Sequence, residues 1–161
     1  MAAAVDSVGA WAALLRVHAS VVPKLARRLA AHGLPLAWYD VLLVLNAAPG
    51  RKLRMTELGA SAVLSRERIS RVVGELEDAG LVRREPNPED RRSSFAALTG
   101  EGRRRLRAAA PTYLAGIEEH YTRHLDAREI QVITRALGKV LAAEELSAAD
   151  PPPPAPRVRR R

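Results

Sequence analysis

The sequence predicts a mainly α-helical protein with six helices and a small β-sheet of two or three short strands. Apolar residues recur at spacings of three and four before residue 47 and again after residue 99, as amphipathic helices require. Between these regions, two short stretches of strand character flank a turn that contains two prolines. Hydrophobic residues make up 47% of the chain and aromatic residues only 4%, so the core must consist largely of Leu, Val, Ile and Ala.

Two helices come first. Residues 6–31 form a long amphipathic pattern, and one helical face carries Trp11, Leu14, Leu15, His18, Val21, Val22, Leu25 and Leu29. Pro23 lies inside this pattern and has no amide to bond to the carbonyl of Ala19, so we expect a kink there. Gly33 ends the helix. Pro35 suits the first turn of a second helix, 36–47, whose residues are nearly all apolar.

The next segment predicts two helices joined by a turn. Residues 52–54 form a short basic strand, Thr56 can cap a brief helix over 57–62, and Ser65 can cap a longer helix that starts at Arg66. Helical spacing directs one apolar set of the longer helix to the core: Ile69, Val72, Val73, Leu76 and Ala79. The opposite face then carries Arg66, Glu67, Ser70 and Arg71, with Arg68 on its flank.

A two-stranded wing follows these helices. Gly80 can end the longer helix, and strands over 81–85 and 94–98 are joined by the turn 86–92. This order predicts a winged helix-turn-helix, a module that lays one helix in the DNA major groove. Arginine can pair with guanine, serine reaches phosphates or bases, and a wing arginine can enter a narrow minor groove. The predicted DNA-contact residues are Thr56, Ser65, Arg66, Arg68, Ser70, Arg71, Arg91 and Arg92, with Asp90 holding a wing arginine in position.

The charge distribution agrees with a nucleic-acid partner. Residues 51–107 contain 14 of the 26 Lys and Arg residues and 9 of the 18 acidic ones, and so carry +5 of the net +8. The absence of cysteine excludes disulfides and thiolate metal sites and suits a reducing cytosol. We expect no signal peptide, no membrane span and no cofactor. No phosphate-binding loop, nucleophile elbow or metalloprotease motif is present, so we expect no enzyme activity.

Two further helices complete the pattern. Thr99 can cap a fifth helix that runs to about Leu125 and bends at Pro111, and its first turns carry the basic run 103–105. Asp126 and Glu129 have the spacing of a capping box for the last helix, whose apolar face holds Ile130, Ile133, Leu137, Val140 and Leu141. Residues 147–161 are rich in Pro and Arg and predict a disordered tail that can reach phosphates non-specifically.

Several motifs together resemble the multiple-antibiotic-resistance regulator (MarR) family. They are 36–42 (LAWYDVL), 55–58 (MTEL), 64–66 (LSR) with Ser70-Arg71, 76–82 (LEDAGLV), and Asp90-Arg91-Arg92 leading to Ala97-Leu98-Thr99. The resemblance covers roughly residues 10–142. Pro23 in the first helix and Gly100, where an acidic residue is frequent, depart from the family pattern, and the former puts the shape of the first helix in question.

The resemblance implies a dimeric bacterial transcription regulator, usually a repressor, that a small anionic or phenolic ligand releases from a near-palindromic operator in double-stranded DNA. It divides the chain into a dimerisation helix (1–34), a DNA-binding winged helix (35–99), C-terminal dimerisation helices (100–146) and the tail (147–161). The effector site would lie near Trp11, His18, Trp38, Tyr39 and Tyr113. Such a homodimer would be cytoplasmic and associated with the nucleoid.

Two alternatives remain open at the level of sequence. His120 and His124 are four residues apart and could share a helical face, which is compatible with a metal- or pH-responsive regulator if a third ligand exists. The basic face could instead belong to a helical interaction protein that binds an acidic partner and no specific DNA site. A steep salt-dependent preference for one DNA sequence separates the second alternative from a DNA-binding regulator.

Overall fold

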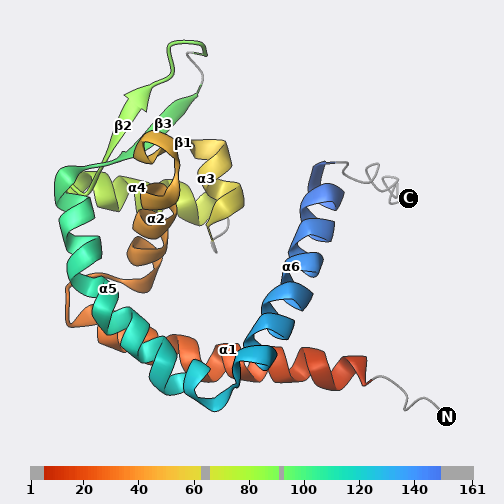
Figure 1. The fold of residues 1–161 in the computed structure, drawn as a ribbon. Coiled ribbons are helices and arrows are strands. Elements are labelled where there is room, and N and C mark those ends of the chain that lie inside the picture. The colour runs from red at the N-terminus through yellow and green to blue at the C-terminus, as the bar shows by residue number, and fades with distance from the viewer. Residues whose placement is uncertain (1–5, 63–65, 91–92, 150–161) are drawn as a thin grey trace, which may run out of the picture. The chain divides into compact units, whose positions relative to one another are not determined.

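The computed structural model describes residues 6–62, 66–90 and 93–149, and over these ranges it confirms the predicted fold class (Figure 1). The helices are α1 (Ser7–Ala30), α2 (Leu36–Ala47), α3 (Met55–Ser61), α4 (Arg66–Asp78), α5 (Gly100–His120) and α6 (Ala127–Ala149). The strands are β1 (Lys52–Arg54), β2 (Val82–Pro86) and β3 (Ser94–Leu98). Two short 3₁₀ helices, η1 (Pro49–Arg51) and η2 (Thr122–His124), lie in connections.

The sheet has three antiparallel strands in the order β1-β3-β2, so β3 is the central strand. Ala96 of β3 faces Leu53 on one side and Arg84 on the other. Ala96, Ala97 and Leu98 are all buried, so the second half of the central strand is covered on both faces. The hairpin of β2 and β3 extends away from the helices as the predicted wing (Figure 1).

Residues 6–121 form one compact unit around an aliphatic core. Leucines from four different helices are completely buried in it: Leu29, Leu42, Leu45, Leu58 and Leu76. Helix α2 contacts α3, α4 and α5, and α1 packs along α5 (Figure 1). Because α2 is the shared neighbour, its burial holds the two helices of the helix-turn-helix against the rest of the unit.

Two predicted helix ends meet at one junction. Gly80 adopts a φ of 71°, and the amides of Gly80 and Leu81 bond to the carbonyls of Glu77 and Leu76, which closes α4 as expected. The hydroxyl of Thr99 accepts the Gly102 amide at 3.0 Å and so caps α5, as predicted. The same hydroxyl lies 2.8 Å from the carbonyl of Gly80, so one side chain joins the end of α4 to the start of α5.

Two local predictions were wrong, and a third is not tested. Thr56 does not cap α3, because the helix starts at Met55 and the carboxylate of Glu57 accepts the Arg54 amide at 2.9 Å. Helix α5 ends at His120 and not near Leu125, since Tyr121 leaves helical geometry with φ −138° and ψ −69°. Helix α1 runs as one element through Pro23, whose ring removes one backbone hydrogen bond, and the kink expected there stays a prediction.

The second unit begins at Thr122 and contains η2 and α6. Asp126 and Glu129 form the predicted capping box, in which each carboxylate accepts the other residue's amide at 2.8 Å. Helix α6 extends to Ala149, so the segment predicted as a disordered tail from residue 147 is helical over its first three residues. Residues 150–161 lie outside the described ranges. Within those ranges, no helix has the length and apolarity that crossing a membrane requires.

The close approach of α5 to the start of β2 makes Gly102 the most sensitive glycine of the junction. A Cβ at Gly102 would collide with the carbonyl oxygen of Leu81 and lie only 2.9 Å from Leu98 Cδ1. We expect Gly102→Ala to lower the free energy of unfolding by about 1–3 kcal/mol, because backbone cannot yield as a flexible side chain does. Urea denaturation followed by circular dichroism measures this change.

Gly100→Ala is the matched control, since it lies in the same helical turn and its Cβ would meet nothing within 4 Å. We expect its unfolding midpoint to equal or exceed that of the wild type. Equal stability of the two variants would contradict the packing of α5 against Leu81.

Candidate nucleic-acid interface

Helix α4 has one buried and one exposed face. Ile69, Val73 and Leu76 are at most 2% exposed and pack into the core, whereas the side chains of Ser70 and Arg71 are exposed to solvent. Glu67 and Arg68 are exposed on the same helix. The sequence predicted this division, except that Ala79, expected in the core, is exposed just after the end of the helix. The division leaves the N-terminal half of α4 available for contact with another molecule. Helix α4 begins at Arg66, and Ser65 lies outside the described residues.

Helices α3 and α4 pack against each other and enclose a shallow hollow. The hollow has a volume of about 260 Å³ and is lined by Met55, Thr56, Gly59, Ile69, Ser70 and Arg84. Thr56 and Ser70, two of the predicted contact residues, therefore lie on one concave surface. A surface of this kind is compatible with a DNA backbone that passes over α3 while α4 occupies the groove.

Arg84 connects the wing to α4. Its Nε lies 3.3 Å from the Glu77 carboxylate, and its backbone amide donates to the same carboxylate at 3.1 Å. Its guanidinium also reaches the backbone carbonyl of Ser70 at 3.4 Å. These contacts fix the angle between β2 and α4, so that the hairpin and the exposed face of α4 keep a defined relation.

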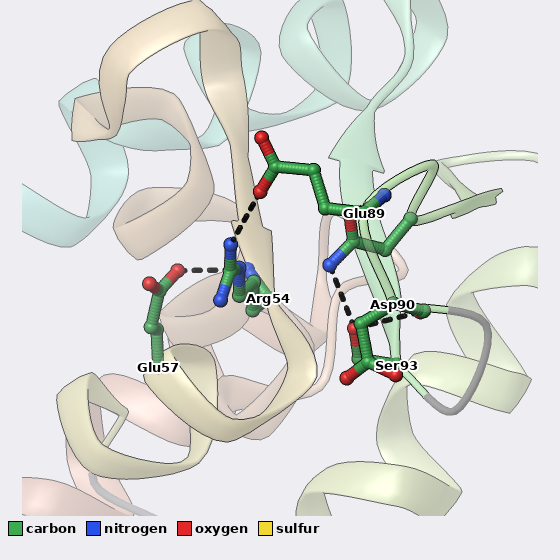
Figure 2. A network of polar contacts seen from close by, with 6 residues as sticks. Arg54, Glu57, Glu89, Asp90 and Ser93 are labelled. Carbon is green, nitrogen blue, oxygen red and sulfur yellow. Dashed lines mark hydrogen bonds and ion pairs between the residues drawn. The ribbon is translucent and has the colours of Figure 1, made fainter.

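The wing turn is organised by a buried amide, Asn87, whose exposed fraction is 2%. Its Nδ2 donates to the Ser93 hydroxyl at 2.7 Å, and its Oδ1 accepts the Glu89 amide at 3.1 Å. The Ser93 hydroxyl in turn donates to the carbonyl of Asp90 (Figure 2). One side chain thus bonds to both arms of the turn. Arg91 and Arg92 lie outside the described residues, and the role of Asp90 in holding them stays a prediction.

An ion pair joins the wing turn to the start of α3. Arg54 Nη2 lies 3.2 Å from the Glu89 carboxylate, and the Arg54 amide is bonded to Glu57 (Figure 2). Exposed fractions of 43% for the Arg54 side chain and 79% for that of Glu89 mean that water screens the pair, which contributes little to stability. Its importance is electrostatic, because it places a carboxylate beside a cation near the predicted DNA-contact residues.

The outer face of the sheet carries alternating charges around Phe95. Lys52 and Arg54 lie 5.1 and 5.9 Å from the centre of the Phe95 ring, within the range of cation–π attraction. Glu85 opposes Phe95 on the neighbouring strand and pairs with Arg83 and Lys52. Hydrogen bonds from Arg83 and then from Lys52 lower the pKa of Glu85, so this carboxylate remains charged and partly neutralises the sheet surface.

The five residues predicted for an effector site do not all lie together in the structure. Tyr39 and Tyr113 contact each other, with ring centres 4.5 Å apart, and burial raises the pKa of both hydroxyls. Trp38 donates its indole N–H to Glu75 of α4 at 2.8 Å. Trp11 and His18 are exposed on α1, and Trp11 has 61% of its surface accessible. The structure therefore brings the two tyrosines together beside the core and leaves the two α1 residues at the surface.

The two candidate metal ligands do not share a helix. His120 is the last residue of α5, and His124 belongs to η2, since the helix breaks at Tyr121. The expected i, i+4 arrangement is therefore wrong. Across the ranges that the structure describes, no group of three or more His, Asp or Glu side chains is arranged to hold a metal ion.

Comparisons with known proteins agree on one family. The family model described as "MarR family" matches residues 32–93. The transcriptional regulator HosA of Escherichia coli O111:H- is 30% identical over 105 residues, 65% of this chain and 76% of that protein. Sco3205 of Streptomyces coelicolor, a MarR family transcriptional regulator solved in complex with DNA, is 31% identical with a TM-score of 0.82, over 97% of this chain and 98% of that chain.

The chain belongs to the MarR family of transcriptional regulators. A further solved member of similar fold is CouR from Rhodococcus jostii RHA1 bound to p-coumaroyl-CoA, 28% identical with a TM-score of 0.71. That alignment covers 84% of this chain and 92% of CouR.

The polar residues that organise the wing of this MarR-family chain were not singled out from its sequence. Asn87 lies between two prolines, and an amide at such a position commonly bonds to a backbone amide two residues on, so local turn chemistry could have identified it. Arg54 and Glu89 are 35 residues apart, and Lys52 and Glu85 are 33 apart. Pairing at such separations depends on the strand register, which the sequence alone does not specify.

The Arg54–Glu89 pair predicts a gain of DNA affinity when the carboxylate is removed. We expect Glu89→Gln to strengthen DNA binding by roughly two- to fivefold at low salt, because Arg54 is freed and one negative charge near the phosphates is lost. Fluorescence anisotropy with labelled duplex DNA at several salt concentrations measures the change.

The double variant Arg54→Met/Glu89→Gln is the control. We expect the double variant to bind DNA no more tightly than Arg54→Met alone, because the gain from Glu89→Gln depends on Arg54. A gain that persists without Arg54 would mean that Glu89 acts on DNA directly and that the ion pair is irrelevant to binding.

Proposed function

We propose that this MarR-family regulator is a homodimeric repressor that binds a near-palindromic DNA operator and is released by a small aromatic or anionic ligand. The observation that carries the proposal is the division of α4, whose apolar side is buried while Ser70 and Arg71 are exposed. Sco3205, similar over nearly its whole length, was solved with DNA, which supports the same partner here.

In this proposal α4 enters the major groove. Arg71 can pair bidentately with a guanine, and Ser70 can reach a base or a phosphate from the adjacent position. Arg66 and Arg68 supply further positive charge on the same helix, and Thr56 and Ser65 contact the backbone beside it. Arg91 and Arg92 on the wing enter the flanking minor groove, where Asp90 orients one of them. Phosphate contacts set the register, while contacts to base edges set the sequence preference.

Exposed apolar side chains on the terminal helices support a homodimer. On α1, Val8, Trp11 and Leu15 have exposed fractions of 76%, 61% and 49%. On α6, Val140 and Leu141 have exposed fractions of 58% and 64%. Apolar faces of this extent are typical of protein–protein interfaces, because exposure of apolar side chains to water is unfavourable. Residues 1–34 and 100–146 accordingly serve dimerisation, and the dimer sets the spacing of the two α4 helices at about 34 Å.

The effector proposal rests on the aromatic residues between α2 and α5. Tyr39 and Tyr113 contact each other next to α2, and Trp38 is bonded to Glu75 on α4. A planar ligand that inserts near the tyrosines would move α2, and α2 contacts α4 directly. Trp11 and His18 would contribute from the dimer arm. CouR, a family member of similar fold, was solved with p-coumaroyl-CoA, an aromatic anionic ligand.

Substitution of Arg71 tests the role of α4. We expect Arg71→Ala to weaken binding to a selected operator by about 1–3 kcal/mol and binding to random duplex DNA much less, because a base contact is lost. Gel-shift titration against both DNAs measures the ratio. Arg16→Ala, an exposed arginine on α1, is the control and should bind both DNAs as the wild type does. If Arg71→Ala keeps the wild-type ratio of operator affinity to random-DNA affinity, base readout by α4 is contradicted.

Substitution of an exposed α1 residue tests the dimer. We expect Leu15→Asp to shift the protein from dimer to monomer at micromolar concentration, because a charge cannot be buried unpaired in an apolar interface. Sedimentation velocity measures the mass. Arg27→Asp, exposed farther along the same helix, should remain dimeric. A wild-type protein that sediments as a monomer would contradict the proposal outright.

A further inference from the structure

Two glutamates in the last turn of α4 are bonded to different neighbours of the helix. Trp38 of α2 donates its indole N–H to the Glu75 carboxylate at 2.8 Å. Arg84 of β2 donates its backbone amide to the Glu77 carboxylate at 3.1 Å, and its Nε lies 3.3 Å from the same group. Residues two positions apart point about 200° apart around an α-helix, so the two bonds reach α4 on different flanks. Together they oppose rotation of α4 about its own axis.

The two carboxylates lie in an unfavourable place for the helix itself. Glu75, Glu77 and Asp78 are at the C-terminal end of α4, where the helix dipole disfavours anions, and the last turn contains no basic residue. Both α2 and β2 pack against α4, and each places a donor against one glutamate. The contribution of these glutamates therefore comes from what they bind outside the helix.

Trp38 is an effective donor because its own position is fixed. Its side chain is partly buried and packs against the aliphatic core. The next residue, Tyr39, is 3% exposed and contacts Tyr113 of α5, so α2 is anchored beside Trp38. An indole has two side-chain torsions and a single N–H, which it offers in one direction. The hydrogen bond to Glu75 therefore ties the orientation of α4 to the position of α2.

The buried face of α4 constrains this rotation less sharply than the two hydrogen bonds do. Its core residues are aliphatic, and apolar contacts are non-directional. A small rotation of the helix moves the tip of a long exposed side chain, such as that of Arg71, farther than it moves the backbone. Recognition of a base edge requires placement within about 0.5 Å and 20°. Directional bonds at Glu75 and Glu77 provide control of this kind.

We propose that Trp38 is a positioning residue for DNA recognition, which sets the rotation of α4 through Glu75. The rotation determines which base edges Ser70 and Arg71 reach. This inference rests on the proposed function, in which α4 enters the major groove. Binding to DNA of any sequence depends mainly on positive charge, which the bond does not alter. Loss of the bond therefore reduces sequence preference and leaves general affinity for DNA in place.

Removal of the indole N–H tests the proposal in the full-length protein. We expect Trp38→Phe to lower the ratio of operator affinity to random-DNA affinity by about tenfold, because the base contacts of α4 are misplaced while its charges remain. Glu75→Ala should lower the ratio to the same extent, and it changes an exposed side chain while the core stays intact. Fluorescence anisotropy with labelled operator and random duplexes measures both affinities.

Glu75→Gln is the conservative variant, because its amide oxygen still accepts the indole N–H, and its ratio should stay within about twofold of the wild type. Asp78→Ala is the matched control, since it removes an exposed carboxylate from the same turn without touching the bond to Trp38. It should change the affinity for both DNAs equally. The double variant Trp38→Phe/Glu75→Ala should be no worse than either single variant, because all three lose the same bond.

The bond itself is observable by nuclear magnetic resonance. The chain contains two tryptophans, and the indole N–H signal that disappears in Trp38→Phe belongs to Trp38. We expect Glu75→Ala to shift this signal upfield by more than Glu75→Gln does, because the first variant loses the hydrogen bond and the second only weakens it.

A structural role alone gives a different result. If Trp38→Phe and Glu75→Ala lower the unfolding midpoint but keep the wild-type ratio of affinities, the proposal is overturned and the proposed function stands. A wild type that prefers no DNA sequence contradicts the proposed function and this inference together.

Discussion

The junction of Leu81, Thr99 and Gly102 is the contact on which the arrangement of the DNA-binding unit depends. The Thr99 amide donates to the Leu81 carbonyl, and the Thr99 hydroxyl joins the Gly80 carbonyl to the amide of Gly102. Two short segments, 80–81 and 99–102, are thus bonded to each other where α4 ends, β2 starts and α5 begins. Because three elements meet here, the direction of the wing, of α4 and of α5 cannot change independently.

A second set of contacts connects the wing to the helix-turn-helix at two places along the hairpin. Near the base, Arg84 binds Glu77 and the Ser70 carbonyl of α4. Near the turn, Glu89 meets Arg54 at the start of α3. All of these groups are polar and mostly exposed, so they define geometry more than they add stability. The aliphatic core beneath them supplies the stability, and the polar contacts determine where the cationic residues lie.

The sequence predicted well the helix caps and helix ends that depend on neighbouring residues. Gly80, Thr99 and the Asp126–Glu129 capping box act within four residues, and their roles were read directly from residue type and spacing. Thr56 failed as a cap because Glu57 competes for the start of the same helix. The end of α5 was missed because Ile117, Tyr121 and Leu125 keep a helical spacing through a break that only backbone angles reveal. The Arg54–Glu89 pair depends on tertiary packing, which no local pattern contains.

The buried amide of Asn87 has a consequence for the chemical lifetime of the protein. Asparagine side chains deamidate when the nitrogen of the following residue attacks the side-chain carbonyl and releases ammonia. Here the following residue is Pro88, whose ring nitrogen carries no hydrogen, so a neutral cyclic imide cannot form. The amide is also shielded from water and held at both ends by hydrogen bonds. The asparagine that organises the wing turn therefore resists deamidation, and its side chain stays a neutral amide.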